Sequence, residues 1–478
     1  MTTSALPSPC PARAARPGRL GLAVLLSGGF ITIFDLFVVN IAIPSMQRTL
    51  DASFAQINFI IVAYELAYGV LLIAGSRLGD RLGRRRLFVL GMLGFALTSA
   101  LCGLAPDANA LICARALQGV AAAMLFPQVY ALIRVSYDGH ARRRAFGLLG
   151  MTLGLAAIAG QVLGGWIVHA DLFGLSWRVI FLVNVPLGLA AWKLARHLPE
   201  SREPSASSMD WPGAALAGLG LGLLMLALIE GPARHWPAWT LASAMLAVAA
   251  LALFVRAQRR IGAAGGAPLV DMTLLTQPRF ATGCLLVLLV FSTAAALFLC
   301  YALLMQTGLG VDALTAGSIF APASVGFVAG SMLAPRLVAR HGTPAIALAA
   351  LLYGGATAAL MLQVGAAGGA LSPWSLVPVL VWLGAAQGAV NTPLVNLTLG
   401  LVPDHQAGMA AGVVSTLQQV GAALGVAAAG MLFSGALEAG AGAAAGDRYA
   451  QAFASALQFN VAAIALSALL LWRLGRRG

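Results

Sequence analysis

Charge is what this sequence has least of. Only 9% of its 478 residues are Asp, Glu, Lys or Arg, whereas a soluble domain carries about 25%. Lysine occurs once, as Lys193, and 60% of the residues are hydrophobic. The composition therefore excludes a soluble globular protein and predicts an all-α integral membrane protein.

Cysteine and histidine are also scarce and scattered. The five cysteines are odd in number and lack C-x-x-C spacing, and the six histidines lack the spacing of metal ligands. A disulfide framework and a metal site are therefore not expected. Catalytic-triad spacing, a nucleotide-binding loop, a pore-loop filter and a long soluble segment are missing too, so we expect neither an enzyme, a channel nor a receptor, and no bound cofactor.

The net charge of +13 suggests nucleic-acid binding at first sight. However, the arginines fall between apolar runs instead of lining one face. We interpret them as topology signals in loops, and we expect no nucleic-acid partner.

Apolar runs long enough to cross a bilayer, about 20 residues each, occur fourteen times. The first follows a basic tail, 1–19, and is too long for the apolar region of a signal peptide. The runs are 20–43, 55–75, 87–105, 108–133, 145–169, 175–196, 211–230, 237–256, 280–305, 313–339, 343–364, 373–402, 407–436 and 451–473.

The 29 basic residues orient these spans. With the N-terminus inside, 24 of them lie in inside segments, four lie outside, and Arg115 lies within a span. Such a bias follows the positive-inside rule and supports an even number of spans with both ends cytoplasmic.

Two long inside segments, 197–210 and 257–279, separate spans seven and eight from six spans on either side. This predicts a cytoplasmic tail (1–19), an N-terminal six-helix bundle (20–200), two extra helices with linkers (201–279) and a C-terminal six-helix bundle (280–478). Many secondary transporters are built from such repeats, with the substrate site between the halves.

The inside turn between spans two and three combines glycines, arginines and one aspartate. Glycines allow two helix ends to approach closely, and we expect Asp80 and the arginines to latch this turn against the other half as a gate. A weaker copy, 334–342, follows the tenth span. The predicted gating residues are Gly75, Gly79, Asp80, Arg81, Gly83, Arg84 and Arg85.

Three ionisable residues lie deep inside the spans, away from their ends, where charge is costly and is therefore functional or paired. Counting 1.5 Å per residue from the outer surface, Asp35, Glu65 and Arg115 lie at depths of about 12, 15 and 10 Å. We expect Asp35 and Arg115 to pair, and Glu65 to take up and release a proton. The alternatives are that the two acids exchange roles, or that the pair is structural and Glu65 only lines a wet cavity.

Small and polar residues mark two further features. Small residues at i+4 spacing in the fifth span predict close helix packing and a seam on which the halves rock; the residues concerned are Gly150, Gly154, Gly160, Gln161, Gly164 and Gly165. Uncharged polar residues within other spans predict a wetted path or cavity; these are Gln118, Asn391, Asn396 and Gln418.

These motifs resemble a known family. The turn 75–87 resembles the loop 2–3 signature of the major facilitator superfamily, and segments 111–123 and 150–165 resemble its span 4 and span 5 motifs. Segments 34–44 and 177–186 are similar to marks of its fourteen-span drug:proton antiporter branch. The chain departs from the family pattern at Gln161, where proline is usual, and at Glu65, where the residue is often apolar.

The resemblance implies a major facilitator fold of two six-helix bundles plus two extra central helices, and a multi-pass protein of the inner or plasma membrane. It implies an exporter of small amphipathic or cationic compounds driven by protons entering the cell, with Arg115 implicated in proton coupling. The alternative is a proton symporter that imports a metabolite. Protons, a small-molecule substrate and the lipid bilayer are the expected partners of a monomer, joined in a Gram-negative cell by a periplasmic adaptor and an outer-membrane channel.

Overall fold

A computed structural model of the chain describes residues 19–202, 210–266, 268–402 and 407–476. Most of the predicted basic tail therefore lies outside the described residues. Within them the chain is helical, and 13 helices are long and apolar enough to cross a membrane. Thirteen of the fourteen predicted runs each correspond to one of these helices, apart from small differences at their ends, because uninterrupted apolar segments of this length satisfy their backbone hydrogen bonds only as helices.

The first helices are α1 (Arg19–Leu50), α2 (Phe54–Leu82), α3 (Arg84–Gly103), α4 (Ala108–Ser136), α5 (Gly139–Ala170), α6 (Arg178–Leu182) and α7 (Asn184–Leu194). Next come α8 (Trp211–Ala233), α9 (Ala238–Ala263) and the short α10 (Met272–Thr276). The last are α11 (Pro278–Ala302), which continues into a π-helical turn η3 (Leu303–Gly308), then α12 (Ala313–His341), α13 (Thr343–Ala367), α14 (Val377–Gly400), α15 (Ala407–Ala439) and α16 (Ala445–Arg476).

The predicted span 175–196 differs from the others, because it forms two short helices, α6 and α7, that meet at Val183. Pro186 has no N–H to donate to the carbonyl of Leu182, four residues earlier, which favours a break at this point. Both short helices pack on α3.

Sharp helix–helix turns occur where the sequence has glycine. Gly83 separates α2 from α3 with φ +110°, and Gly342 separates α12 from α13 with φ +67°. Both values are costly for a residue with a side chain. The two turns that the sequence predicts to be copies therefore both depend on a glycine with positive φ.

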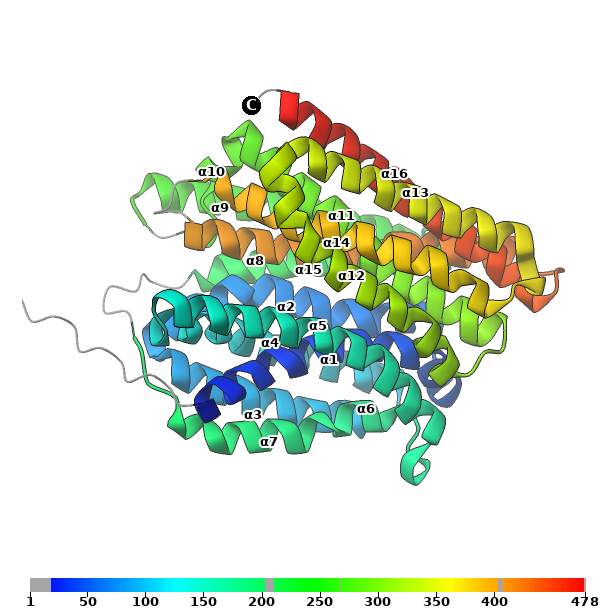
Figure 1. Cartoon of the computed structure of the whole chain (residues 1–478), viewed down its shortest axis with the longest axis horizontal. Coiled ribbons are helices and arrows are strands. Elements are labelled where there is room, and N and C mark those ends of the chain that lie inside the picture. The colour runs from blue at the N-terminus through cyan, green and yellow to red at the C-terminus, as the bar shows by residue number, and fades with distance from the viewer. Residues whose placement is uncertain (1–18, 203–209, 267, 403–406, 477–478) are drawn as a thin grey trace, which may run out of the picture.

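The helices form two groups that run side by side (Figure 1). Helices α1–α7 lie in one group and α11–α16 in the other, and α8 packs against both α2 and α15. The groups meet chiefly where α2 packs on α15 and α5 packs on α12. We call the end that carries the turn 76–86 the inner end, and the opposite end the outer end.

Candidate functional site

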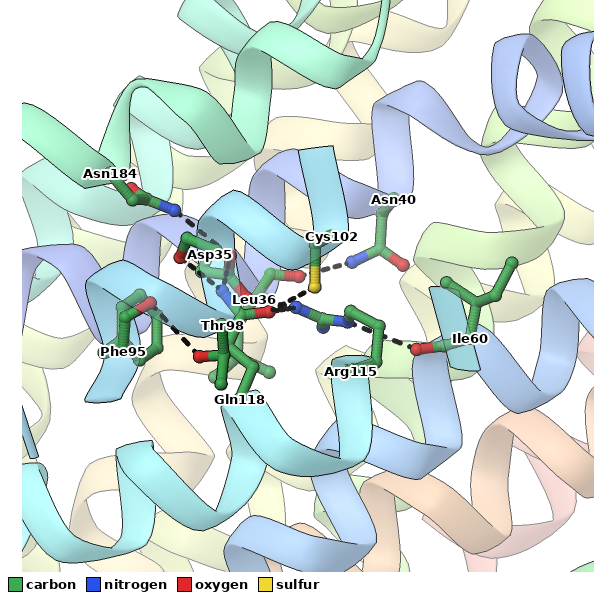
Figure 2. A network of polar contacts seen from close by, with 11 residues as sticks. Asp35, Leu36, Asn40, Ile60, Phe95, Thr98, Cys102, Arg115, Gln118 and Asn184 are labelled. Atoms are coloured by element: carbon green, nitrogen blue, oxygen red, sulfur yellow. Dashed lines mark hydrogen bonds and ion pairs between the residues drawn. The ribbon is translucent and has the colours of Figure 1, made fainter. Parts of the chain in front are cut away.

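A buried polar network lies between α1, α4 and α7 (Figure 2). Arg115 on α4 donates a hydrogen bond from Nη1 to Oδ2 of Asp35 on α1, and both side chains are almost fully buried. Asp35 Oδ1 accepts two more hydrogen bonds, from Gln118 Nε2 at 2.9 Å and from Asn184 Nδ2 at 3.3 Å. The predicted pair of Asp35 and Arg115 is thus present, within a larger network.

Gln118 connects the two charges. Its Oε1 accepts a hydrogen bond from Arg115 Nη1 at 2.7 Å, and its Nε2 also donates to the hydroxyl of Ser99 at 2.8 Å. Gln118 lies one helical turn from Arg115 on α4, so both side chains point to the same side of the helix. The sequence predicted that Gln118 lines a wetted path, whereas in the structure it forms hydrogen bonds with both members of the charge pair.

Aromatic rings and a backbone carbonyl surround the remaining faces of the Arg115 guanidinium. The guanidinium lies 4.2 Å from the ring centre of Tyr64, and Nε donates to the carbonyl of Ile60 at 3.3 Å. Both partners are on α2. A cation over an aromatic face is stabilised by the ring quadrupole, so α2 helps to offset the cost of burying this charge.

Glu65 does not join the network by any hydrogen bond or ion pair of the described residues. Its side chain is only 4% exposed, and Oε2 has no hydrogen-bond partner there. A buried carboxylate without a partner is costly, and taking up a proton removes most of that cost. The two acids therefore differ in their surroundings: Asp35 is bound by three neighbouring side chains, whereas Glu65 Oε2 has no partner among the described residues.

The glycine- and arginine-rich turn contacts its own half at the inner end. Asp80 accepts hydrogen bonds from Arg84 at 2.7 and 3.0 Å, and Arg84 donates to Ser201 at 2.9 Å. The backbone N–H of Arg85 donates to Oε1 of Glu200 at 3.1 Å. In this conformation the turn is therefore tied to the segment that leaves α7, while Arg81 is exposed.

The glycines at the end of α2 allow contact with α4. A Cβ at Gly75 would overlap the carbonyl of Ala123, and one at Gly79 would overlap the side chain of Gln128. Gln128 in turn donates to the carbonyl of Gly75 at 3.0 Å. These two glycines act in helix packing, which positions the turn.

Most small residues of α5 lie close to neighbouring helices, on two sides of the helix. Gly160 and Gly164 lie against Phe37 and Val38 of α1, where an added Cβ would come within 2.8 and 2.6 Å. The backbone at Gln161 lies against Gly317 of α12.

The exception is Gly150, because the distance between α5 and α12 grows along the helices. A Cβ at Gly165 would overlap the carbonyl of Ala313, one at Gly154 would lie 3.3 Å from Val328, and one at Gly150 would have no atom within 4 Å. In this conformation Gly150 therefore makes no close contact with another helix. Along this pair, the two helices are closest at the outer end and diverge toward the inner end.

Three further contacts close the outer end between the halves. Gln306 in η3 donates to the carbonyl of Ile41 on α1 at 2.7 Å, and the rings of Phe54 and Phe433 stack with centroids 5.9 Å apart. His169 at the end of α5 lies 3.4 Å from Asp312.

Asp312 also caps α12 by accepting from the N–H of Thr315 at 3.0 Å. Slight burial acts to raise the pKa of this carboxyl, but the hydrogen bonds from Thr315 and the nearby His169 outweigh it, so the pKa lies below its usual value. Asp312 therefore remains a charged partner for His169 over a wide pH range.

Comparison with known proteins identifies the family. The profile of the Major Facilitator Superfamily matches residues 25–426. The chain belongs to the major facilitator superfamily. It is a multi-pass membrane transporter of that family.

Several relatives of this facilitator carry names from drug or antibiotic transport. It is 36% identical over 418 residues to the probable actinorhodin transporter of Streptomyces coelicolor, covering 87% of this chain and 72% of the relative. It is 34% identical over 461 residues to a puromycin resistance protein of Streptomyces alboniger, covering 95% and 90%. The drug efflux pump JefA of Mycobacterium tuberculosis is 32% identical over 424 residues, covering 87% and 80%.

Solved structures support the fold. A bacterial homolog of the human lysosomal transporter Spinster, in an inward-facing and occupied conformation, aligns with a TM-score of 0.65 at 16% identity over 95% of this chain and 96% of that one. A POT family transporter in complex with a thioalcohol-conjugated peptide aligns with a TM-score of 0.68 at 15% identity over 97% and 99%.

The other predicted cavity residues of this facilitator are not brought together. Asn391 is buried on α14 and its Oδ1 has no partner among the described residues, whereas Asn396 is exposed near the end of the same helix. Gln418 is half-buried on α15. Five residues separate Asn391 from Asn396, about 140° around a helix, so the two cannot line one narrow path.

Sequence reasoning missed how the segment 177–186 serves the site. Trp177 is fully buried and donates to Thr49 Oγ1 at 2.6 Å, which attaches this segment to α1. Asn184, further along, then reaches Asp35. The segment was identified as a family mark, but no spacing in the sequence relates residue 184 to residue 35.

The described residues contain no group of three or more His, Cys, Asp or Glu side chains that could hold a metal ion.

Proposed function

We propose that this facilitator is a proton-coupled antiporter of the plasma membrane that exports small amphipathic compounds. The names of its relatives, which refer to actinorhodin, puromycin and drug efflux, favour export of such compounds over uptake of a metabolite. The matches of segments 34–44 and 177–186 favour the fourteen-span drug:proton branch.

The observation that carries the proton-coupling part is the buried ion pair of Asp35 and Arg115. A proton that reaches Asp35 neutralises the carboxylate and removes the charge partner of Arg115, which then favours another arrangement of α1 and α4. Proton binding thereby changes the relative free energy of two conformations, which is what coupling requires. Intramembrane ionisable residues serve proton transfer in many transporters.

Glu65 is the second acid in this scheme. Because it lacks a partner in the closed-outside conformation, it is available to carry a second proton or to bind a cationic substrate. Exchange of these roles between Asp35 and Glu65 is the competing assignment, and variants of each acid distinguish the two.

The turn at Asp80 would control the conformational change. Its attachment to residues 198–201 belongs to the conformation with a closed outer end, and we propose that its charges exchange these partners for the other half when the outer end opens. The two six-helix bundles, 20–200 and 280–478, would then rock about the region between them, with 201–279 as a peripheral insertion.

Everted membrane vesicles test both the direction of transport and the coupling. In a host without its own pumps, vesicles that acidify their lumen should accumulate antibiotics or dyes from a compound panel, and a protonophore should abolish this accumulation. Asp138→Asn is a matched control, because this exposed acid pairs with Arg142 outside the bundle interior.

Movement of every transported compound out of the acidic lumen, together with protons, would instead establish the symporter. Accumulation that survives the protonophore would contradict proton coupling. A periplasmic adaptor would appear as a co-purifying partner of the full chain in a Gram-negative host.

A further inference from the structure

A groove lies along one side of α9, one of the two extra helices. It is shallow and open, every residue that lines it is on α9, and the space along it measures about 860 Å³. The residues that define this α9 arginine groove are Val248, Leu251, Val255, Arg256, Arg259 and Arg260. They recur at helical spacing, so the apolar residues continue directly into the arginines along one stripe.

The three arginines of the groove are exposed, and no hydrogen bond or ion pair connects them to other described residues. The nearest acids along the chain are engaged elsewhere. Asp210 accepts hydrogen bonds from Gln258 at 2.5 Å and from the N–H of Gly213 at 2.8 Å, and Asp271 caps α10. Three guanidinium groups therefore face outward without a counter-charge from the described protein.

The groove lies at the inner end of the bundle. Arg77, in the turn that marks this end, donates to the carbonyl of Pro268 at 2.5 Å, and Gln258 on α9 accepts from the N–H of Val270 at 3.0 Å. These contacts fix the end of α9 beside the turn. Helix α9 packs on α8 and α10 (Figure 1), away from Asp35 and Arg115, so the groove is not part of the transport path.

We propose that the α9 arginine groove binds an anionic phospholipid of the inner leaflet. The phosphate group would lie among Arg256, Arg259 and Arg260, since a guanidinium group can donate two parallel hydrogen bonds to two oxygens of one phosphate. One acyl chain would follow Val255, Leu251 and Val248 into the membrane.

The apolar part of the stripe is what selects a lipid over a free phosphate ion. From Arg256 to Val248 the helix rises about 12 Å, which is close to the roughly 15 Å of hydrocarbon in one leaflet. Val248 is 65% exposed, and the main contacts of α9 among the described residues are with α8 and α10. The length, the polarity and the charge of the groove therefore match one molecule that has an anionic head and an apolar chain.

Native mass spectrometry of the purified full chain tests this proposal. Phosphatidylglycerol and phosphatidylethanolamine with the same acyl chains are added in turn, and bound lipids are counted. Each arginine near an anionic lipid contributes about fivefold in affinity. We expect wild type to prefer phosphatidylglycerol by at least about tenfold, and R256Q/R259Q/R260Q to lose that preference.

A control triple variant, R134Q/R144Q/R340Q, removes the same charge from exposed arginines at the ends of other helices and should keep the preference. R259Q alone, with an expected loss of about fivefold, serves if the triple variant yields no folded protein. Excess inorganic phosphate should leave the bound lipid in place.

Three outcomes would overturn the proposal. They are an unchanged preference in the groove variants, an equal loss in the control variant, and displacement of the lipid by inorganic phosphate.

Discussion

The substitution Asp35→Asn tests both the stability and the function of the buried network. It removes the charge that balances Arg115, although the new amide has the same shape as the carboxylate. Two of its neighbours, Gln118 and Asn184, donate to Asp35 Oδ1. If the amide nitrogen of the new side chain replaces Oδ1, it faces two hydrogen-bond donors and cannot accept from either. The amide oxygen, in the place of Oδ2, can still accept from Arg115.

The size of the effect follows from burial. Asp35 is 0% exposed and Arg115 is 1% exposed, so water cannot replace the lost partner. Breaking a buried ion pair by removing one charge costs about 3–5 kcal/mol. We therefore expect Asp35→Asn to lower the free energy of unfolding by about 3 kcal/mol or more.

The double variant Asp35→Asn with Arg115→Gln leaves no unpaired charge. Because the penalty of Asp35→Asn arises from the isolated cation, the double variant should be more stable than Asp35→Asn alone by about 2 kcal/mol. The control Asp138→Asn changes an exposed pair and should stay within about 1 kcal/mol of wild type. Reversible unfolding of the purified proteins in lipid nanodiscs provides these values.

Transport by the same variants in proteoliposomes separates the two interpretations of the pair. If Asp35 carries the proton, both the single and the double variant should lose transport driven by a pH gradient, even though the double variant regains stability. Gradient-driven transport by a well-folded double variant would refute the coupling role and leave the pair structural. A double variant no more stable than Asp35→Asn alone would refute the energetic argument, because the isolated cation would then not be what destabilises the single variant.

Three further predictions concern the second acid, the inner turn and the outer closure. Glu65→Gln should either reduce the number of protons exchanged per substrate or abolish the export of cations while neutral compounds are still exported. If the proton-to-substrate ratio and the range of substrates, measured in proteoliposomes, are unchanged, Glu65 only lines a cavity. Asp80→Asn frees Arg84 from its partner and should slow turnover without weakening substrate binding, so equal rates in stopped-flow transport would exclude a gating role. Asp312→Asn should weaken both the cap of α12 and the contact with His169, so hydrogen exchange at 310–316 should become faster. In wild type the contact between Asp312 and His169 should persist as the outside pH falls, until the pH passes below the usual aspartate pKa of 3.8. Loss of protection from exchange already near neutral pH would contradict that assignment.

Hydropathy and charge in the sequence were sufficient to predict the helices of this protein. Uninterrupted apolar runs must become helices in a bilayer, because only helices satisfy every backbone group within the run. The exception, 175–196, also has a local cause that the sequence contains, namely Pro186. The repeated glycine turns were equally predictable, since Gly83 and Gly342 adopt backbone angles that other residues rarely accept.

The pair of Asp35 and Arg115 was predictable for a different reason. Two opposite charges at similar depth in a low-dielectric layer stabilise each other strongly, and few alternative partners exist within the spans. Depth alone did not decide which acid would pair, because Glu65 lies in the same layer as Asp35. Depth along a helix follows from counting residues, but the direction of a side chain around the helix depends on how neighbouring helices pack.

Sequence alone thus determined which segments cross the membrane and which end of the bundle carries the arginines. It also determined which residues within the spans are so polar that they must be paired or functional. Only the tertiary structure decided which of these residues meet. Gln118 and Asn184 bind Asp35 because α4 and α7 lie beside α1, and Gly150 remains unpacked because α5 and α12 diverge toward the inner end. The physical reason is that helix formation depends on local hydrogen bonds and hydropathy, whereas contacts between distant helices depend on the fit of many side chains at once.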